Sequence, residues 1–104
     1  MAYPSKYKDA QVEILGEPST ARQLTAGSAS SNTALTSTVQ RISIRAVGAD
    51  IRFSIGTGTQ TANGNTSNFI ANGERLDFAV PVGANIAVIR DGTVNGTLEL
   101  TELI

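Results

Sequence analysis

The side chains that most often carry out chemistry in proteins are scarce in this chain of 104 residues, which has no histidine, cysteine or tryptophan. Without histidine or cysteine, neither Ser-His-Asp nor Cys-His nucleophilic sites can form, and zinc sites lose their usual ligands. Carboxylate pairs of the glycosidase type remain possible, but the acidic residues lie in predicted turns, at outward strand positions or near the termini. The calcium-loop pattern is missing from the sequence. The sequence therefore predicts a protein that is not an enzyme and has no metal site or cofactor.

The first candidate binding residues lie close to the N-terminus. Tyr3 and Tyr7 are two of only five aromatic residues in the chain, and they are interleaved with Lys6 and Lys8. The following proline disfavours helix at Tyr3, and apolar residues are too sparse here for a core. Because tyrosine is enriched at interface hot spots, one interpretation is an extended arm that docks on a neighbouring molecule. The alternative is a frayed terminus.

The clearest strand pattern runs from Val39 to Ile55. Period-two alternation of apolar and polar residues on both sides of a Gly/Asp turn predicts a β-hairpin with one buried face. The apolar positions are Ile42, Ile44 and Ala46 before the turn at 47–50, and Ile51, Phe53 and Ile55 after it.

The predicted hairpin makes Arg45 and Arg52 candidate binding residues. If Ala46 lies opposite Ile51, then Arg45 lies opposite Arg52 on the outer face, where facing like charges are destabilising. The pair then binds an anion or a partner, or it is neutralised by Asp77 or Glu99 on neighbouring strands.

The apolar run from Ile86 to Ile89 supplies the last two candidates. The turn signal Asp91-Gly92 predicts a hairpin in which Ile89 pairs with Val94. That register leaves Ile86 and Val88 on the outer face, where an apolar pair is covered by the N-terminal segment or forms an oligomer contact.

The segment Gly56–Ser67 contains no apolar residue larger than alanine. It is long for a loop, and it lacks the Gly-Lys-Ser/Thr ending of a phosphate-binding loop. We expect it to project from the surface, where long loops often carry function.

Short strands and turn signals alternate along the rest of the chain. Further strands are predicted at Val12–Leu15, Asn68–Ala71, Glu74–Val80 and Thr97–Leu103, and residues 25–38 form either a linker or an edge strand. Six to eight short strands without a convincing helix predict an all-β protein, an antiparallel β-sandwich that is jelly-roll-like or a small barrel. We assign residues 1–27 to an extended arm and linker with one short strand, and residues 28–104 to the sandwich domain.

The charge and the hydropathy of the chain argue against two classes of partner, nucleic acids and membranes. The formal net charge is −1, so no basic stripe favours nucleic acid. No run approaches the roughly 18 apolar residues of a membrane span, and the N-terminus lacks the apolar region of a signal peptide. These features favour synthesis in a cytoplasm and no partnership with nucleic acid or membrane.

Several runs resemble a known family: Ser31–Thr36, Arg41–Ala46 and Ile51–Gly56, then Phe78–Gly83, Ile86–Gly92 and Thr97–Leu103. Over roughly residues 28–104 the chain is similar to small virion structural proteins of tailed bacteriophages. The resemblance implies a capsid decoration (cement) protein on the virion capsid surface, with the major capsid protein as partner and a homotrimer as the favoured oligomer. It brings no catalytic residue. The alternative is a tail or fibre-associated component that binds a host surface or carbohydrate.

Overall fold

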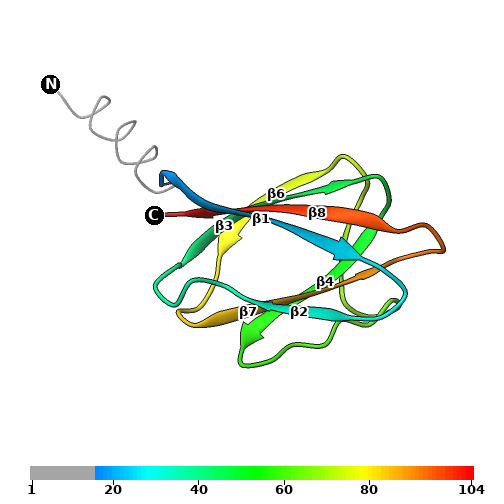
Figure 1. Cartoon of the computed structure of the whole chain (residues 1–104), viewed down its shortest axis with the longest axis horizontal. Helices are drawn as coiled ribbons and strands as arrows, with labels where there is room; N and C mark the ends of the chain where they lie inside the picture. The colour runs from blue at the N-terminus through cyan, green and yellow to red at the C-terminus, as the bar shows by residue number, and fades with distance from the viewer. Residues whose placement is uncertain (1–15) are drawn as a thin grey trace, which may run out of the picture.

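The computed structural model describes residues 16–104, which form eight β-strands and no helix. The strands build two four-stranded antiparallel sheets that pack face to face (Figure 1). The predicted antiparallel β-sandwich is therefore confirmed. The strands are β1 (Pro18–Ala26), β2 (Ser31–Ala34), β3 (Arg41–Val47), β4 (Ile51–Thr57), β5 (Asn68–Ile70), β6 (Arg75–Ala79), β7 (Ala84–Arg90) and β8 (Gly96–Leu103).

The strand order is that of a jelly roll. The first sheet has the order β1-β8-β3-β6 and the second has the order β2-β7-β4-β5. Successive strands therefore alternate between the two sheets, except for β4 and β5, which pair with each other. Two interlocked Greek keys of this kind define the double-sheet jelly roll, so three or four connections meet at each end of the sandwich.

The predicted hairpin between Ile42–Ala46 and Ile51–Ile55 is wrong. Strand β3 lies in the first sheet and β4 in the second, and Ala46 lies opposite Leu98 rather than Ile51. The turn between them is sharp, with a φ of 91° at Gly48, but it carries the chain across the sandwich. Period-two alternation shows that a strand buries one face. It does not distinguish two strands paired in one sheet from two strands packed face to face.

The same correction applies to the other predicted hairpin turns. The Asn72-Gly73 turn joins β5 to β6, and the Asp91-Gly92 turn joins β7 to β8, so both connect one sheet to the other. Ile89 consequently lies opposite Arg52 on β4 and does not pair with Val94.

The sandwich begins before residue 28. Strand β1 pairs with β8 along most of its length, from Pro18 opposite Leu103 to Ala26 opposite Gly96. Just before β1, Glu17 and Ile104 exchange reciprocal backbone hydrogen bonds of 2.8 Å each. Strand β1 therefore belongs to the sandwich, as an edge strand of the first sheet, and not to the arm and linker to which residues 1–27 were assigned. The predicted strand at Val12–Leu15 lies outside the described residues.

The core lies between the inner faces of the sheets. It contains Leu24, Ala26, Leu35, Val39, Ile42, Ile44, Ala46, Ile51, Phe53, Ile70, Val80, Ala84, Ile86, Val88, Leu98 and Leu100. The rings of Phe53 and Phe78 stack across the sandwich, with centroids 5.9 Å apart. Burial of a large apolar side chain contributes about 1.5–3 kcal/mol to stability. The inward-facing side chains of the alternating strands therefore supply most of the stabilisation.

The segment Gly56–Ser67 does not project from the surface. The side chain of Ser54 on β4 donates to Gln60 Oε1, and the Gln60 backbone N–H donates to Asn32 Oδ1 on β2. In register, Ala87 on β7 lies between Ser54 and Asn32, so the loop crosses the outer face of the second sheet. Ala62 is only 4% exposed. The loop packs over the sheet because the Gln60 side chain bonds to Ser54 on β4, and the backbone N–H groups of Gln60 and Ala62 donate to Asn32 on β2 and to Ser30 beside it. Composition does not reveal these contacts.

Candidate functional site

The eight predicted binding residues do not form one site. Tyr3, Lys6, Tyr7 and Lys8 lie outside the described residues. The other four, Arg45, Arg52, Ile86 and Val88, are distributed over the outer faces of both sheets and the core.

Arg45 and Arg52 are not neighbours. Arg45 is exposed on the outer face of the first sheet, where it lies between Glu99 on β8 and Arg75 on β6. Glu99 is one of the carboxylates expected to offset its charge. The paired-arginine site is excluded, because the two arginines belong to different sheets.

Arg52 is held by structural contacts on the outer face of the second sheet. Its Nε donates to Asp91 Oδ1 at 2.8 Å, and its Nη1 donates to the backbone oxygen of Ser67 at 3.0 Å. The guanidinium also lies over the ring of Phe69, 4.9 Å from the centroid, which is a cation–π geometry. Arg52 therefore ties the loop 58–67 and the β7–β8 turn to β4.

Ile86 and Val88 are core residues and not an outer patch. Their exposed fractions are 0% and 1%, and they lie opposite Ile55 and Phe53 on β4. The prediction was wrong because it derived the faces of β7 from a hairpin with β8. The two strands are in different sheets, so the phase of one does not set the phase of the other.

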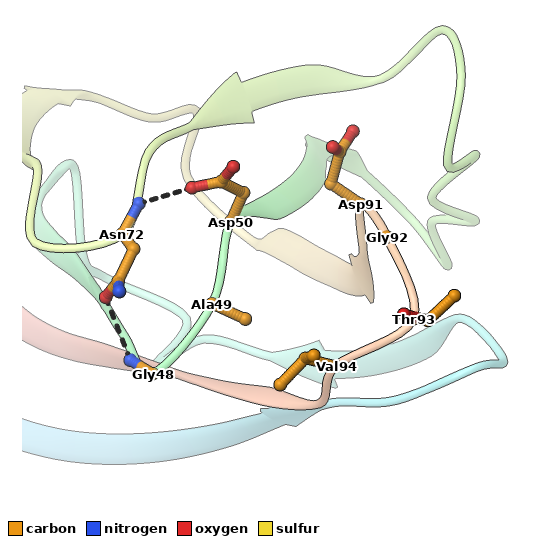
Figure 2. A pocket seen from close by; sticks show the side chains of 8 residues that line it. All are labelled: Gly48, Ala49, Asp50, Asn72, Asp91, Gly92, Thr93 and Val94. Atoms are coloured by element: carbon orange, nitrogen blue, oxygen red, sulfur yellow. Dashed lines mark hydrogen bonds between the residues drawn. The ribbon is translucent and has the colours of Figure 1, made fainter.

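One candidate site is a pocket at the end of the sandwich where three crossovers meet. It has a volume of about 320 Å³ and is lined by Gly48, Ala49, Asp50, Asn72, Asp91, Gly92, Thr93 and Val94. We call it the end-loop pocket. Figure 2 shows the carboxylates of Asp50 and Asp91 on the same side of the pocket, above the side chain of Val94.

Hydrogen bonds between the turns hold this pocket together. Asp50 Oδ1 accepts from the backbone N–H of Asn72 at 2.8 Å, and Asn72 Oδ1 accepts from the backbone N–H of Gly48 at 3.0 Å (Figure 2). The backbone N–H of Asp91 donates to the backbone oxygen of Asp50 at 3.1 Å. Carboxylate and amide oxygens beside an exposed apolar side chain suit a neutral ligand rich in hydroxyl groups.

Both carboxylates of the end-loop pocket are already bonded within the protein. Among residues 16–104, no group of three or more acidic or sulfur or imidazole ligands could hold a metal ion. Asp91 is paired with Arg52, and Asp50 is bonded to a backbone amide, so both carboxylates already stabilise turns. The sequence shows a Gly within two residues of an Asp or Asn in each turn, but only the jelly-roll crossovers bring these turns together.

The second candidate site lies along the open side of the sandwich, between the edge strands β5 and β6. It is a groove of about 370 Å³ lined by Phe53, Asn68, Phe69, Leu76, Asp77 and Phe78. We call it the edge groove. It gathers all three phenylalanines of the chain, and Phe69 is 43% exposed. A lining with several apolar and aromatic side chains is typical of a surface that binds another protein.

A buried charge lies between the sheets at another position. Glu102 on β8 is 0% exposed, and its Oε2 accepts hydrogen bonds from Arg22 Nε at 3.1 Å and from the backbone N–H of Thr36 at 2.9 Å. Within the described part of the chain, its Oε1 has no partner. Burial raises the pKa of Glu102, but the hydrogen bonds from Thr36 and the charge of Arg22 more than offset this, and the pKa lies below its ordinary value. Glu102 therefore remains ionised at neutral pH and forms a structural ion pair with Arg22.

Comparison of the chain with protein-family models, with curated proteins and with solved structures found no significant match. Across residues 16–104, no helix is long and apolar enough to cross a membrane.

Proposed function

We propose that the protein is a structural virion protein that decorates a tailed-phage capsid and stabilises it by binding the capsid lattice and neighbouring copies. The observation that carries this proposal is the edge groove, in which the half-exposed Phe69 and the partly buried Leu76 and Phe78 lie between two free sheet edges. A surface of this kind suits protein–protein contact rather than catalysis.

Two further arguments support the proposal. The double-sheet jelly roll recurs in viral capsid domains, although a fold alone does not define a function. The sequence also resembles virion proteins over roughly residues 28–104. In this proposal the N-terminal segment acts as an arm, with Tyr3 and Tyr7 as anchors on the major capsid protein, and a homotrimer remains the favoured oligomer.

The experiment compares the full chain with a chain lacking residues 1–11 on heads stripped of the protein. Because all eight described strands lie within residues 18–103, we expect the truncation to leave the melting temperature nearly unchanged while occupancy on heads falls at least tenfold. Tyr3→Ala with Tyr7→Ala should give most of this loss, since truncation of an interface tyrosine can cost about 2 kcal/mol. Ser5→Ala is the matched control. Full-length protein that associates with purified tails and not with heads would refute the capsid assignment.

The end-loop pocket favours a second candidate function. A tail or fibre-associated component could bind host-surface carbohydrate there, because Asp50, Asn72 and Asp91 present oxygen acceptors around an open pocket of about 320 Å³. Binding to a glycan array that is lost in Asp50→Asn and retained in Thr25→Ala would support this function over the first.

A further inference from the structure

The free edge of β6 presents unpaired backbone groups in a defined pattern. Among residues 16–104, strand β6 ends the first sheet and pairs only with β3. The backbone N–H of Val80 donates to Gln40, and that of Ala46 donates to Glu74. In an antiparallel ladder, bonded pairs alternate with non-bonded pairs. The backbone N–H and C=O groups of Arg75, Asp77 and Ala79 therefore point away from β3, toward the open side.

The side chains on this edge are self-complementary in charge. Arg75 and Asp77 lie on the outer face with side-chain exposures of 68% and 43%, and their charged atoms are 3.6 Å apart. Within the sheet, Arg75 lies opposite Arg45, an unfavourable pairing of like charges. A second carboxylate beside Arg75 would offset that repulsion.

We propose that β6 is a docking surface for β6 of a second copy of this chain, paired antiparallel about a two-fold axis at Leu76. In this register Arg75 of each copy lies opposite Asp77 of the other, and the two residues exchange backbone hydrogen bonds. A two-fold contact must be self-complementary, and this one joins the two first sheets into a continuous sheet by strand addition.

The alternative registers are less favourable. An axis at Asp77 places that carboxylate opposite itself, which is destabilising. Charged side chains also serve to block sheet edges, but residues of one sign would block self-pairing more effectively than the opposite charges of Arg75 and Asp77.

The edge groove lies directly beside this strand, so pairing also covers apolar surface. Leu76 and Phe78 are partly buried in the single chain and line the groove with the exposed Phe69. Two-fold pairing sets one groove against the other, with Leu76 facing Leu76 across the axis. Exposed ion pairs alone contribute little, so the backbone bonds and this apolar contact supply most of the affinity.

This inference rests on the part of the proposed function in which copies of the chain bind one another, but it gives that contact two-fold symmetry in place of the three-fold symmetry of a homotrimer. It is tested without a capsid. Sedimentation equilibrium on the full chain should show pairs of copies. Asp77→Arg and Arg75→Asp should each weaken pairing at least tenfold, because each places like charges opposite one another in both halves of the contact. An equal mixture of the two variants should pair about as well as the parent, since every facing pair is again of opposite sign.

Two controls keep the result specific. Thr25→Arg, an exposed change on β1 at the far edge of the first sheet, should pair as the parent does. Rescue in the mixture shows that both variants are folded. In the parent, hydrogen exchange at the backbone amide of Asp77 should slow as protein concentration rises, because pairing bonds that N–H to the second copy. A parent that stays monomeric, or variants that associate as the parent does, would overturn the inference. Either result leaves the occupancy assay on stripped heads as an independent test of capsid binding.

Discussion

Arg22 and Glu102 form one ion pair, but we expect replacement of Arg22 to destabilise the protein far more than replacement of Glu102. The carboxylate of Glu102 is 1% exposed, whereas the Arg22 side chain is 28% exposed. Arg22→Leu leaves a buried charge with Thr36 as its remaining hydrogen-bond partner. Removing one partner of a buried pair costs about 3–5 kcal/mol. Because Thr36 remains and water reaches the Arg22 side, we expect a loss of about 2–3 kcal/mol.

The reverse change should be mild. Glu102→Leu leaves Arg22 free to turn its guanidinium into water, so we expect a loss below about 1 kcal/mol. The double variant replaces the pair with apolar side chains beside Ile42, which faces Glu102 in register, and should be within about 1 kcal/mol of the parent or more stable. For a domain of this size, about 1 kcal/mol corresponds to roughly 4–8 °C in melting temperature, so Arg22→Leu should melt about 10–20 °C below the parent.

The pH dependence provides a second readout from the same four proteins. In the parent, the lowered pKa of Glu102 contributes stability above the unfolded pKa, and this contribution is lost as pH falls through the folded pKa. In Arg22→Leu, the hydrogen bond and the charge of Arg22 no longer lower the pKa of Glu102, so this pKa lies above that of the parent and protonation at low pH removes less stability. The gap between parent and Arg22→Leu should therefore narrow from pH 7 to pH 4. Equal losses for both single variants, or a pH-independent gap, would refute the reasoning.

Two further predictions concern the core and the loop. Phe53→Ala should cost about 3–5 kcal/mol in urea unfolding, since Phe53 is 5% exposed and stacks on Phe78; a melting temperature within two degrees of the parent would contradict its burial. Replacing residues 57–65 with a short Gly/Ser turn should lower stability by about 1–3 kcal/mol, because two hydrogen bonds, from the backbone N–H groups of Gln60 and Ala62 to Asn32 and Ser30, are lost. Unchanged unfolding of that variant would show that the loop does not cover the second sheet.

The strands themselves were predictable from sequence because side-chain alternation is a local property. Each strand shows which of its faces is apolar, and the inward positions of Ile42, Ile44, Leu76 and Phe78 on β3 and β6 follow from that pattern alone. Glycine also marks turns locally, as the φ of 91° at Gly48 illustrates.

The candidate sites depend on contacts that have no local signal. The edge groove requires β5 and β6 to lie at the edges of opposite sheets, and the end-loop pocket requires three crossovers to meet at one end of the sandwich. The same turns were expected to close hairpins, which would have placed them apart.

Sequence by itself determined the class of fold, the strand positions and the residue types with which any chemistry must be built. Only the tertiary structure decided which strands are neighbours. Ala26 pairs with Gly96 and Ile44 with Leu100, across separations at which the sequence carries no periodic signal. The physical reason is that an apolar strand face is satisfied by any apolar surface, whereas the choice of sheet partner depends on how all eight strands close one core together.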